Sequence, residues 1–314
     1  MENLLFSLNA TLPIFFTMML GWFFRKVGLM DEDFVNKLNK FLFTAALPVM
    51  LFNDLAGVDF IEVWDTTFVI FCFSATLVSI LTITALSYLL KNRTFQSEFI
   101  QASYRSSAAI LGISFIQNMY GNTGMAPLMI IATVPLYNVM AVIILSLMKP
   151  ERDKLSRKIV ISALKGILIN PIILGILAGI IWSAIKIPMP AILEKTLNNV
   201  GVVGTPLGLM AMGTTINIKK IKDNIKLSLI SSFIKLIVLP AIFLPIAISF
   251  GFSHEKLVAI LIMLGSATTV SCYIMARNMG HDGTLTSSTI MLSTLLSAFT
   301  LTAWIFIIKT INLI

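Results

Sequence analysis

Charged residues are scarce in this sequence. Asp, Glu, Lys and Arg make up 12% of the 314 residues, while 57% are hydrophobic and the mean hydropathy is +0.92. A soluble protein has roughly 25% charged residues, because its surface faces water. The shortage excludes an ordinary soluble domain. Apolar runs of about 20 residues recur along the chain, and they predict an all-α polytopic membrane protein.

Cysteine, histidine and catalytic motifs are equally sparse. Cys72 and Cys272 both lie in hydrophobic segments and resemble small buried apolar residues rather than a disulfide framework. His254 and His281 fall in loops expected on opposite membrane faces, so they cannot share a metal ion. The sequence contains no HExxH, GxSxG or P-loop signature. We therefore expect no enzyme activity, no metal site and no cofactor.

Ten membrane spans are predicted, each from about 20 mainly apolar residues. They cover residues 4–24, 36–54, 66–90, 98–119, 125–148, 159–185, 191–216, 227–250, 256–279 and 284–309. An even number of spans places both termini on the same side. The loops on one side hold sixteen basic residues and those on the other side only four, so the positive-inside rule places both termini outside the cytoplasm.

The net charge of +8 follows from this topology and from attraction to anionic lipid. No nucleic-acid partner is expected. The location predicted is the cytoplasmic membrane, with multiple passes.

The two halves of the chain repeat each other weakly. An offset of 158 residues aligns Pro13 with Pro171 and Pro48 with Pro206. The predicted organisation is a first five-helix repeat (1–148), a basic cytoplasmic linker (149–158) and a second five-helix repeat (159–314). Because five is odd, the halves enter the membrane from opposite sides. Inverted repeats of this kind are typical of secondary transporters, whose substrate site lies near the midplane between the repeats.

A polar stretch in the ninth span, "GSATTVSCYI" (265–274), corresponds under the repeat to "YRSSAAILGIS" (104–114) in the fourth. Small and hydroxyl residues at mid-span have two explanations. They allow close packing of continuous helices, or they mark discontinuous helices that cross at the midplane and contribute a binding site. Matching positions in both halves favour the second explanation.

Four segments resemble the auxin efflux carrier family, which includes plant auxin exporters and bacterial organic-acid permeases. They are "KFLFTAALPVMLFNDLA" (40–56), "YRSSAAILGIS" (104–114), "VPLYNVMAVIIL" (134–145) and "KLIVLP" (235–240). The resemblance covers essentially the whole chain. It implies a fold like that of the bile-acid symporters, with a scaffold of spans 1, 2, 6 and 7 and a transport domain of spans 3–5 and 8–10 that moves as an elevator.

The resemblance also implies a homodimer formed through the scaffold. The small-residue pairs Thr17/Gly21 and Gly175/Gly179 are compatible with such a contact or with packing inside one chain.

The sequence departs from the family pattern at the crossing segments. Ser114 stands where the family usually has the first crossover proline, and "SATTVSC" (266–272) has no proline at all. Ser107 replaces the asparagine of the fourth span. Asn138 matches the asparagine of the fifth span that contacts substrate in the family, and the resemblance gives it that role.

Two charged residues fall inside predicted spans, Arg105 and Lys235. Long basic side chains near helix ends commonly reach back to the membrane surface. Alternatively, the two residues raise the electrostatic potential of a cavity and attract an anion. The complete set of candidate substrate-binding residues is Arg105, Ser106, Ser107, Gly112, Ser114, Asn138, Lys235, Thr268, Thr269 and Ser271.

The function predicted is a secondary transporter of small organic anions, namely carboxylates that are malate-like or auxin-like. A channel would need a pore built around a symmetry axis, and a sensor that binds the same ligand without transporting it is the other alternative. The six spans of the expected transport domain contain no Asp. We therefore expect transport without obligatory sodium.

Overall fold

The computed structural model is helical throughout the part of the chain that it describes. It describes residues 13, 16–57, 64–90, 92–108, 116, 119–120, 124–148, 169–214 and 218–314. Within these ranges the only β-type pairing is one isolated bridge between Ser106 and Thr268. The predicted all-α class is confirmed.

The described helices differ widely in length, and several follow one another directly. Residues 16–26 are helical. The elements after them are α2 (Glu32–Phe41), η1 (Leu42–Ala46), α3 (Leu47–Ala56), α4 (Thr66–Ser87), η2 (Arg93–Phe95), α5 (Gln96–Tyr104), α7 (Ala126–Leu147), α9 (Pro171–Ile185), α10 (Ala191–Val202), α11 (Gly204–Thr214), α12 (Ile218–Phe233), η3 (Ile234–Val238), α13 (Leu239–Ser249), α14 (His254–Gly265), α15 (Ser271–Asn278) and α16 (Thr284–Thr310).

Four of the described helical stretches are long and apolar enough to cross a bilayer unbroken. They are Thr66–Ser87, Ala126–Leu147, Asn224–Ser249 and Thr284–Thr310, and α9 is a shorter apolar helix. The remaining helices are short or follow one another with a change in geometry. The protein is therefore a multi-pass membrane protein in which continuous and interrupted helices are combined.

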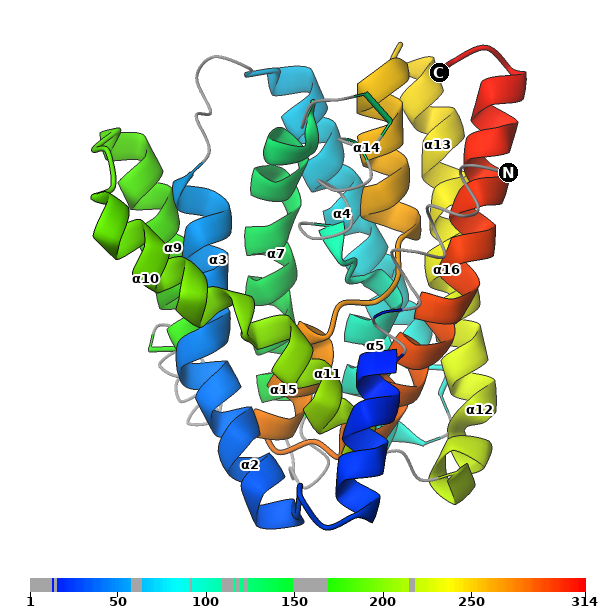
Figure 1. The fold of residues 1–314 in the computed structure, drawn as a ribbon. Coiled ribbons are helices and arrows are strands. Elements are labelled where there is room, and N and C mark those ends of the chain that lie inside the picture. The colour runs from blue at the N-terminus through cyan, green and yellow to red at the C-terminus, as the bar shows by residue number, and fades with distance from the viewer. Residues whose placement is uncertain are drawn as a thin grey trace.

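The helices form two neighbouring groups (Figure 1). In the first group α3 packs against α9 and α10. In the second group α4 packs against α5 and α7, α12 against α16, and α13 against α14. α11 and α15 lie where the groups meet, since α11 contacts α2, α10 and α15. The division into scaffold and transport helices expected from the sequence stays a prediction.

Glycines bring the backbones of the first group into direct contact. A methyl group added at Gly175 of α9 would lie 2.5 Å from the Pro48 carbonyl oxygen, and one added at Gly179 would lie 2.9 Å from that of Phe52. A methyl group added at Gly21 would overlap the Met210 backbone in the same way. Gly21, Gly175 and Gly179 are therefore used for packing inside one chain, which is one of the two roles that the sequence allowed.

Two π-helical turns, η1 and η3, are each followed directly by a Leu–Pro pair. Proline has no N–H, so Pro240 leaves the Leu236 carbonyl without its helical donor. The indole N–H of Trp304 on α16 donates to that carbonyl at 3.0 Å. The wide turn is thus stabilised by a neighbouring helix, as such turns in functional regions commonly are.

The glycine packing gives a direct prediction for Gly175→Ala. The new methyl group would overlap the Pro48 carbonyl oxygen, and overpacking of this kind costs about 1–3 kcal/mol. We expect a lower melting temperature in detergent. Gly57→Ala is the matched control, because the nearest atom to its added methyl group would be 3.7 Å away. Equal melting temperatures for the two variants would contradict the close packing of α3 on α9.

Candidate functional site

Two helices break at the same place in the structure. α5 ends at Tyr104, and Arg105 adopts an extended conformation. α14 ends at Gly265, Ser266 is extended, and α15 begins only at Ser271. The interruption predicted within "GSATTVSCYI" is confirmed, and the alternative of a continuous packed helix is wrong for this segment.

The two extended segments pair with each other, and we call residues 105–107 and 266–270 together the crossover. Ser106 and Thr268 form an antiparallel bridge. The Ser107 N–H donates to the Ala267 carbonyl at 3.0 Å. The Thr268 hydroxyl donates to the Ala102 carbonyl at 2.8 Å. Unwound backbone is tolerated inside a membrane only where the protein supplies such partners.

Arg105 is buried to 1% exposure beside the crossover. Its Nη2 donates to Asn138 Oδ1 at 2.7 Å and to Ser271 Oγ at 2.9 Å, and its Nη1 contacts the sulfur of Met275 at 2.9 Å. Its Nε is buried and has no hydrogen-bond partner among the described residues. None of the ion pairs between described residues includes Arg105. Among the described residues the guanidinium thus has polar partners but forms no ion pair with a carboxylate.

Lys235 is fully buried on the other side of the crossover. Its Nζ donates to the Tyr104 carbonyl at 3.0 Å, to the Met263 carbonyl at 3.3 Å and to Ser106 Oγ. All three N–H groups of the ammonium therefore have partners inside the protein. Neither Lys235 nor Arg105 reaches back to the membrane surface.

A small cavity of about 40 Å³ lies in front of the crossover. Its walls come from α3, from α7 and from both extended segments. The lining residues are Met50, Leu51, Asp54, Arg105, Ser106, Ser107, Ala108, Val134, Tyr137, Asn138, Thr269 and Ser271. Six of the ten residues proposed from the sequence therefore share this cavity.

The other four predicted residues differ in their placement. Thr268 and Lys235 are not among the lining residues, because the hydroxyl of one and the ammonium of the other are turned into the packed crossover. Gly112 and Ser114 lie outside the described residues.

Asp54 is the main lining residue that the sequence analysis missed. It is the last residue of the predicted span 36–54, and the structure places it within α3 and in the cavity wall. Its Oδ2 is buried and has no hydrogen-bond partner among the described residues. An acid at the end of an apolar run was the available signal, but the sequence does not show which way its side chain faces.

Tyr137 lines the cavity beside Asn138 and was also missed. Its hydroxyl donates to the Met263 carbonyl at 3.1 Å, and its own carbonyl accepts from the Tyr104 hydroxyl at 3.1 Å. It therefore ties α7 to the ends of both broken helices. The proline-leucine-tyrosine-asparagine run at 135–138 was the signal for it.

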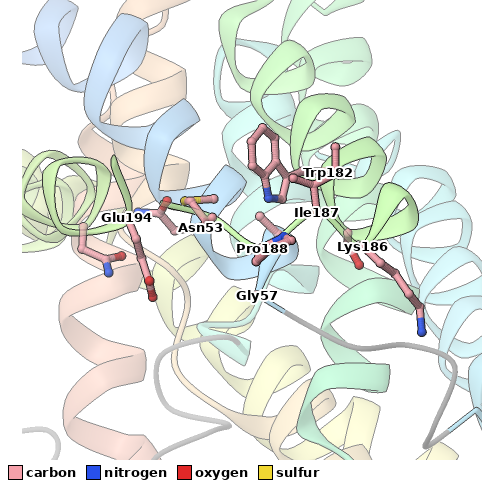
Figure 2. A pocket seen from close by; sticks show the side chains of 11 residues that line it. Asn53, Gly57, Trp182, Lys186, Ile187, Pro188 and Glu194 are labelled. Carbon is pink, nitrogen blue, oxygen red and sulfur yellow. The ribbon is translucent and has the colours of Figure 1, made fainter. Parts of the chain in front are cut away.

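A larger cavity of about 380 Å³ lies between the ends of α3, α9 and α10. Figure 2 shows Lys186 and Glu194 on opposite sides of it, with Trp182 and Asn53 between them. It contains none of the residues of the crossover. Since the buried charge and the unwound backbone both lie at the smaller cavity, we take the smaller one as the functional site.

Glu98 is a buried carboxylate with a structural role. It accepts from the Gly283 N–H at 2.9 Å, from the Thr286 N–H at 3.0 Å and from the Thr286 hydroxyl at 2.9 Å. It therefore caps the start of α16, where a negative charge is favoured by the free N–H groups of the helix. Its oxygens face α16 rather than the crossover.

Comparisons with known proteins agree with this architecture. Residues 6–305 match the model of the family described as "Membrane transport protein". A "Putative malonate transporter" of Rhizobium meliloti is 22% identical over 309 residues, which is 96% of each chain. The "Uncharacterized transporter YfdV" of Escherichia coli K12 is 22% identical over 320 residues, covering 98% of this chain and all of that one. With nearly its whole length matched, and with the motifs quoted above in order, this chain belongs to the membrane transport protein family of auxin efflux carriers.

Proposed function

We propose that this protein is a secondary transporter of small organic anions, carboxylates in particular. The observation that carries the proposal is the Arg105 guanidinium, which is buried at the cavity without a carboxylate partner among the described residues. A buried charge is costly unless it is paired or used. A substrate carboxylate in the cavity would supply the missing partner.

The start of α15 adds to the attraction for an anion. Arg105 donates to Ser271, the first residue of that helix. A helix N-terminus has free N–H groups and a partial positive charge, so two positive features face the same small space. Hydroxyls of Thr269 and Ser107 and the amide of Asn138 complete a wall suited to carboxylate oxygens. The name of the malonate transporter relative supports a substrate of this class.

Alternating access is the mechanism we propose, with the second helix group moving past the first as an elevator. The cavity holds only a few water molecules, whereas ligand pockets are roughly 300–1,000 Å³. Met50, Leu51 and Asp54 of α3 close one wall, and the crossover and α7 supply the others. Displacement of α3 relative to the crossover would therefore open the site. The 5+5 inverted repeat, the domain limits 1–148 and 159–314, and a homodimer through the scaffold are part of this proposal.

The proposed orientation keeps both termini outside the cytoplasm, in the cytoplasmic membrane. It rests on the distribution of basic residues. With a negative potential inside, outward movement of an anion is favoured by about 2.3 kcal/mol per charge and 100 mV. The direction of net transport would then follow the membrane potential and the substrate gradient.

Flux into proteoliposomes tests the function against a channel and a sensor. A carrier predicts saturable uptake of radiolabelled malonate or malate, together with counterflow driven by unlabelled substrate. We expect the flux to persist when sodium is replaced by choline. Flux that does not saturate would indicate a channel, and the absence of flux with intact ligand binding would indicate a sensor. Loss of flux in choline would contradict sodium independence.

The hydroxyls at Thr268 and Thr269 should behave differently. Thr269 lines the cavity, so Thr269→Val should weaken anion affinity roughly 10- to 150-fold, the equivalent of a lost charged hydrogen bond of about 1.5–3 kcal/mol. Thr268 donates to the Ala102 carbonyl, so Thr268→Val should lower the melting temperature and leave affinity nearly unchanged. Binding and melting curves on both variants check this, and the reverse assignment would contradict the described geometry.

Two charges at the cavity should shift affinity in opposite directions. Arg105→Gln removes the cation and should weaken binding at least about tenfold. Asp54→Asn removes the carboxylate and should strengthen binding, roughly 5- to 30-fold for about 1–2 kcal/mol of relieved repulsion. Apparent affinities are measured from uptake against substrate concentration at matched protein levels. Arg25→Gln, at an exposed arginine, is the control, and a change of the same sign in both site variants would refute the anion site.

A further inference from the structure

The ends of the two broken helices present backbone oxygens to one point. Tyr104 is the last residue of α5, and Met263 lies in the last turn of α14. The last four carbonyls of a helix have no partner within the helix. They also carry the negative end of the helix dipole, equivalent to about half an elementary charge for each helix. Two such ends together call for about one positive charge.

Lys235 supplies that charge. Its ammonium donates to the Tyr104 and Met263 carbonyls, one from each broken helix, and to the Ser106 hydroxyl between them. Ser106 Oγ in turn donates to the Met263 carbonyl. The side chain is 0% exposed. The hydrogen-bond partners of the ammonium are therefore all oxygen atoms, and the side chain is shielded from solvent.

The backbone that holds Lys235 is shaped for this contact. Lys235 lies in the π-helical turn η3, which precedes Pro240. A methyl group added at Gly265 would lie 2.8 Å from the Pro240 ring. The absence of a side chain at Gly265 thus allows the Lys235 helix to approach the end of α14.

In transporters with discontinuous helices, unwound carbonyls and the C-terminal ends of half-helices are the groups that coordinate a transported sodium ion. We propose that the Lys235 ammonium occupies such a cation site permanently, as a tethered monovalent cation, and that its removal leaves a site for a free alkali or alkylammonium ion. The effect that Lys235 would have on the sodium dependence of transport rests on the proposed transport function. The cation site itself rests only on the described contacts of Lys235.

The charges around Lys235 agree with a single resident cation. Arg105 is the other cation of the crossover, but it is directed to Ser271 at the start of α15. Glu98 caps α16, and Asp54 lines the cavity, of which Lys235 is not a lining residue. Among the described residues no ion pair involves Lys235. The two helix ends are therefore the negative groups that it neutralises.

Thermal unfolding of the purified full-length protein in detergent tests the proposal. Lys235→Ala should melt well below the wild type in choline chloride. Sodium chloride or methylammonium chloride, at about 100 mM and equal ionic strength, should restore several degrees, because an ion that binds only the folded state stabilises it. Lys235→Ser is the second variant, since its hydroxyl adds an oxygen to the vacated site. Lys226→Ala is the control, at an exposed lysine of the same long helix.

The wild type and Lys226→Ala should show no preference among the three salts. A wild type that is itself stabilised selectively by sodium would overturn the proposal, even if neither Lys235 variant can be purified. Variants that melt like the wild type, or that respond equally to all three salts, would also overturn it.

Flux separates this proposal from the transport function. If the protein transports, Lys235→Ser should gain a sodium dependence that the wild type lacks. Ion-dependent melting without any flux would leave the cation site standing and refute transport. Flux that survives without ion-dependent melting would refute the cation site and leave the transport function standing.

Discussion

Backbone N–H and carbonyl groups that leave a helix inside a bilayer must find partners in the protein, and this requirement governs the structure. At the crossover the partners come from five sources: the Ser106–Thr268 bridge, the Ser107 N–H, and the side chains of Thr268, Tyr137 and Lys235. Each partner fixes the position of the helix that carries it. α7 and η3 are therefore held at the crossover by hydrogen bonds as well as by apolar packing.

The breaks also place helix ends of opposite partial charge on the two sides of the crossover. Their C-terminal ends face Lys235, and the N-terminus of α15 faces Arg105. All three N–H groups of Lys235 have oxygen partners, two of them helix-end carbonyls, whereas the buried Nε of Arg105 has no hydrogen-bond partner among the described residues. This difference in partners, more than the presence of two buried cations, is what makes one side of the crossover a candidate anion site. It also gives the two basic residues different proposed roles in a protein of the auxin efflux carrier family.

The cavity depends on both helix groups. Glycines at 175 and 179 hold α9 tightly on α3, so the wall formed by Met50, Leu51 and Asp54 belongs to a closely packed unit. The crossover and α7 belong to the other group. In the proposed movement such a divided site would open as the two groups move relative to each other, and Asp54 would change its distance from Arg105. The placement of Asp54 thus links the proposed movement to the electrostatic potential of the site.

The sequence by itself determined what depends on local composition: the apolar runs predicted a multi-pass membrane protein, and the hydroxyl-rich run at 266–272 revealed the break, since such residues do not favour a lipid-facing helix. It also brought together Arg105, Asn138, Thr269 and Ser271 as candidates. Only the tertiary structure decided which way each side chain turns. Thr268 and Lys235 face the packed crossover because carbonyls of α5 lie within reach of them there. Asp54 lines the cavity because α3, which continues to Ala56, forms one of the cavity walls. Orientations of this kind depend on contacts more than 100 residues apart in the chain, which composition and spacing do not encode.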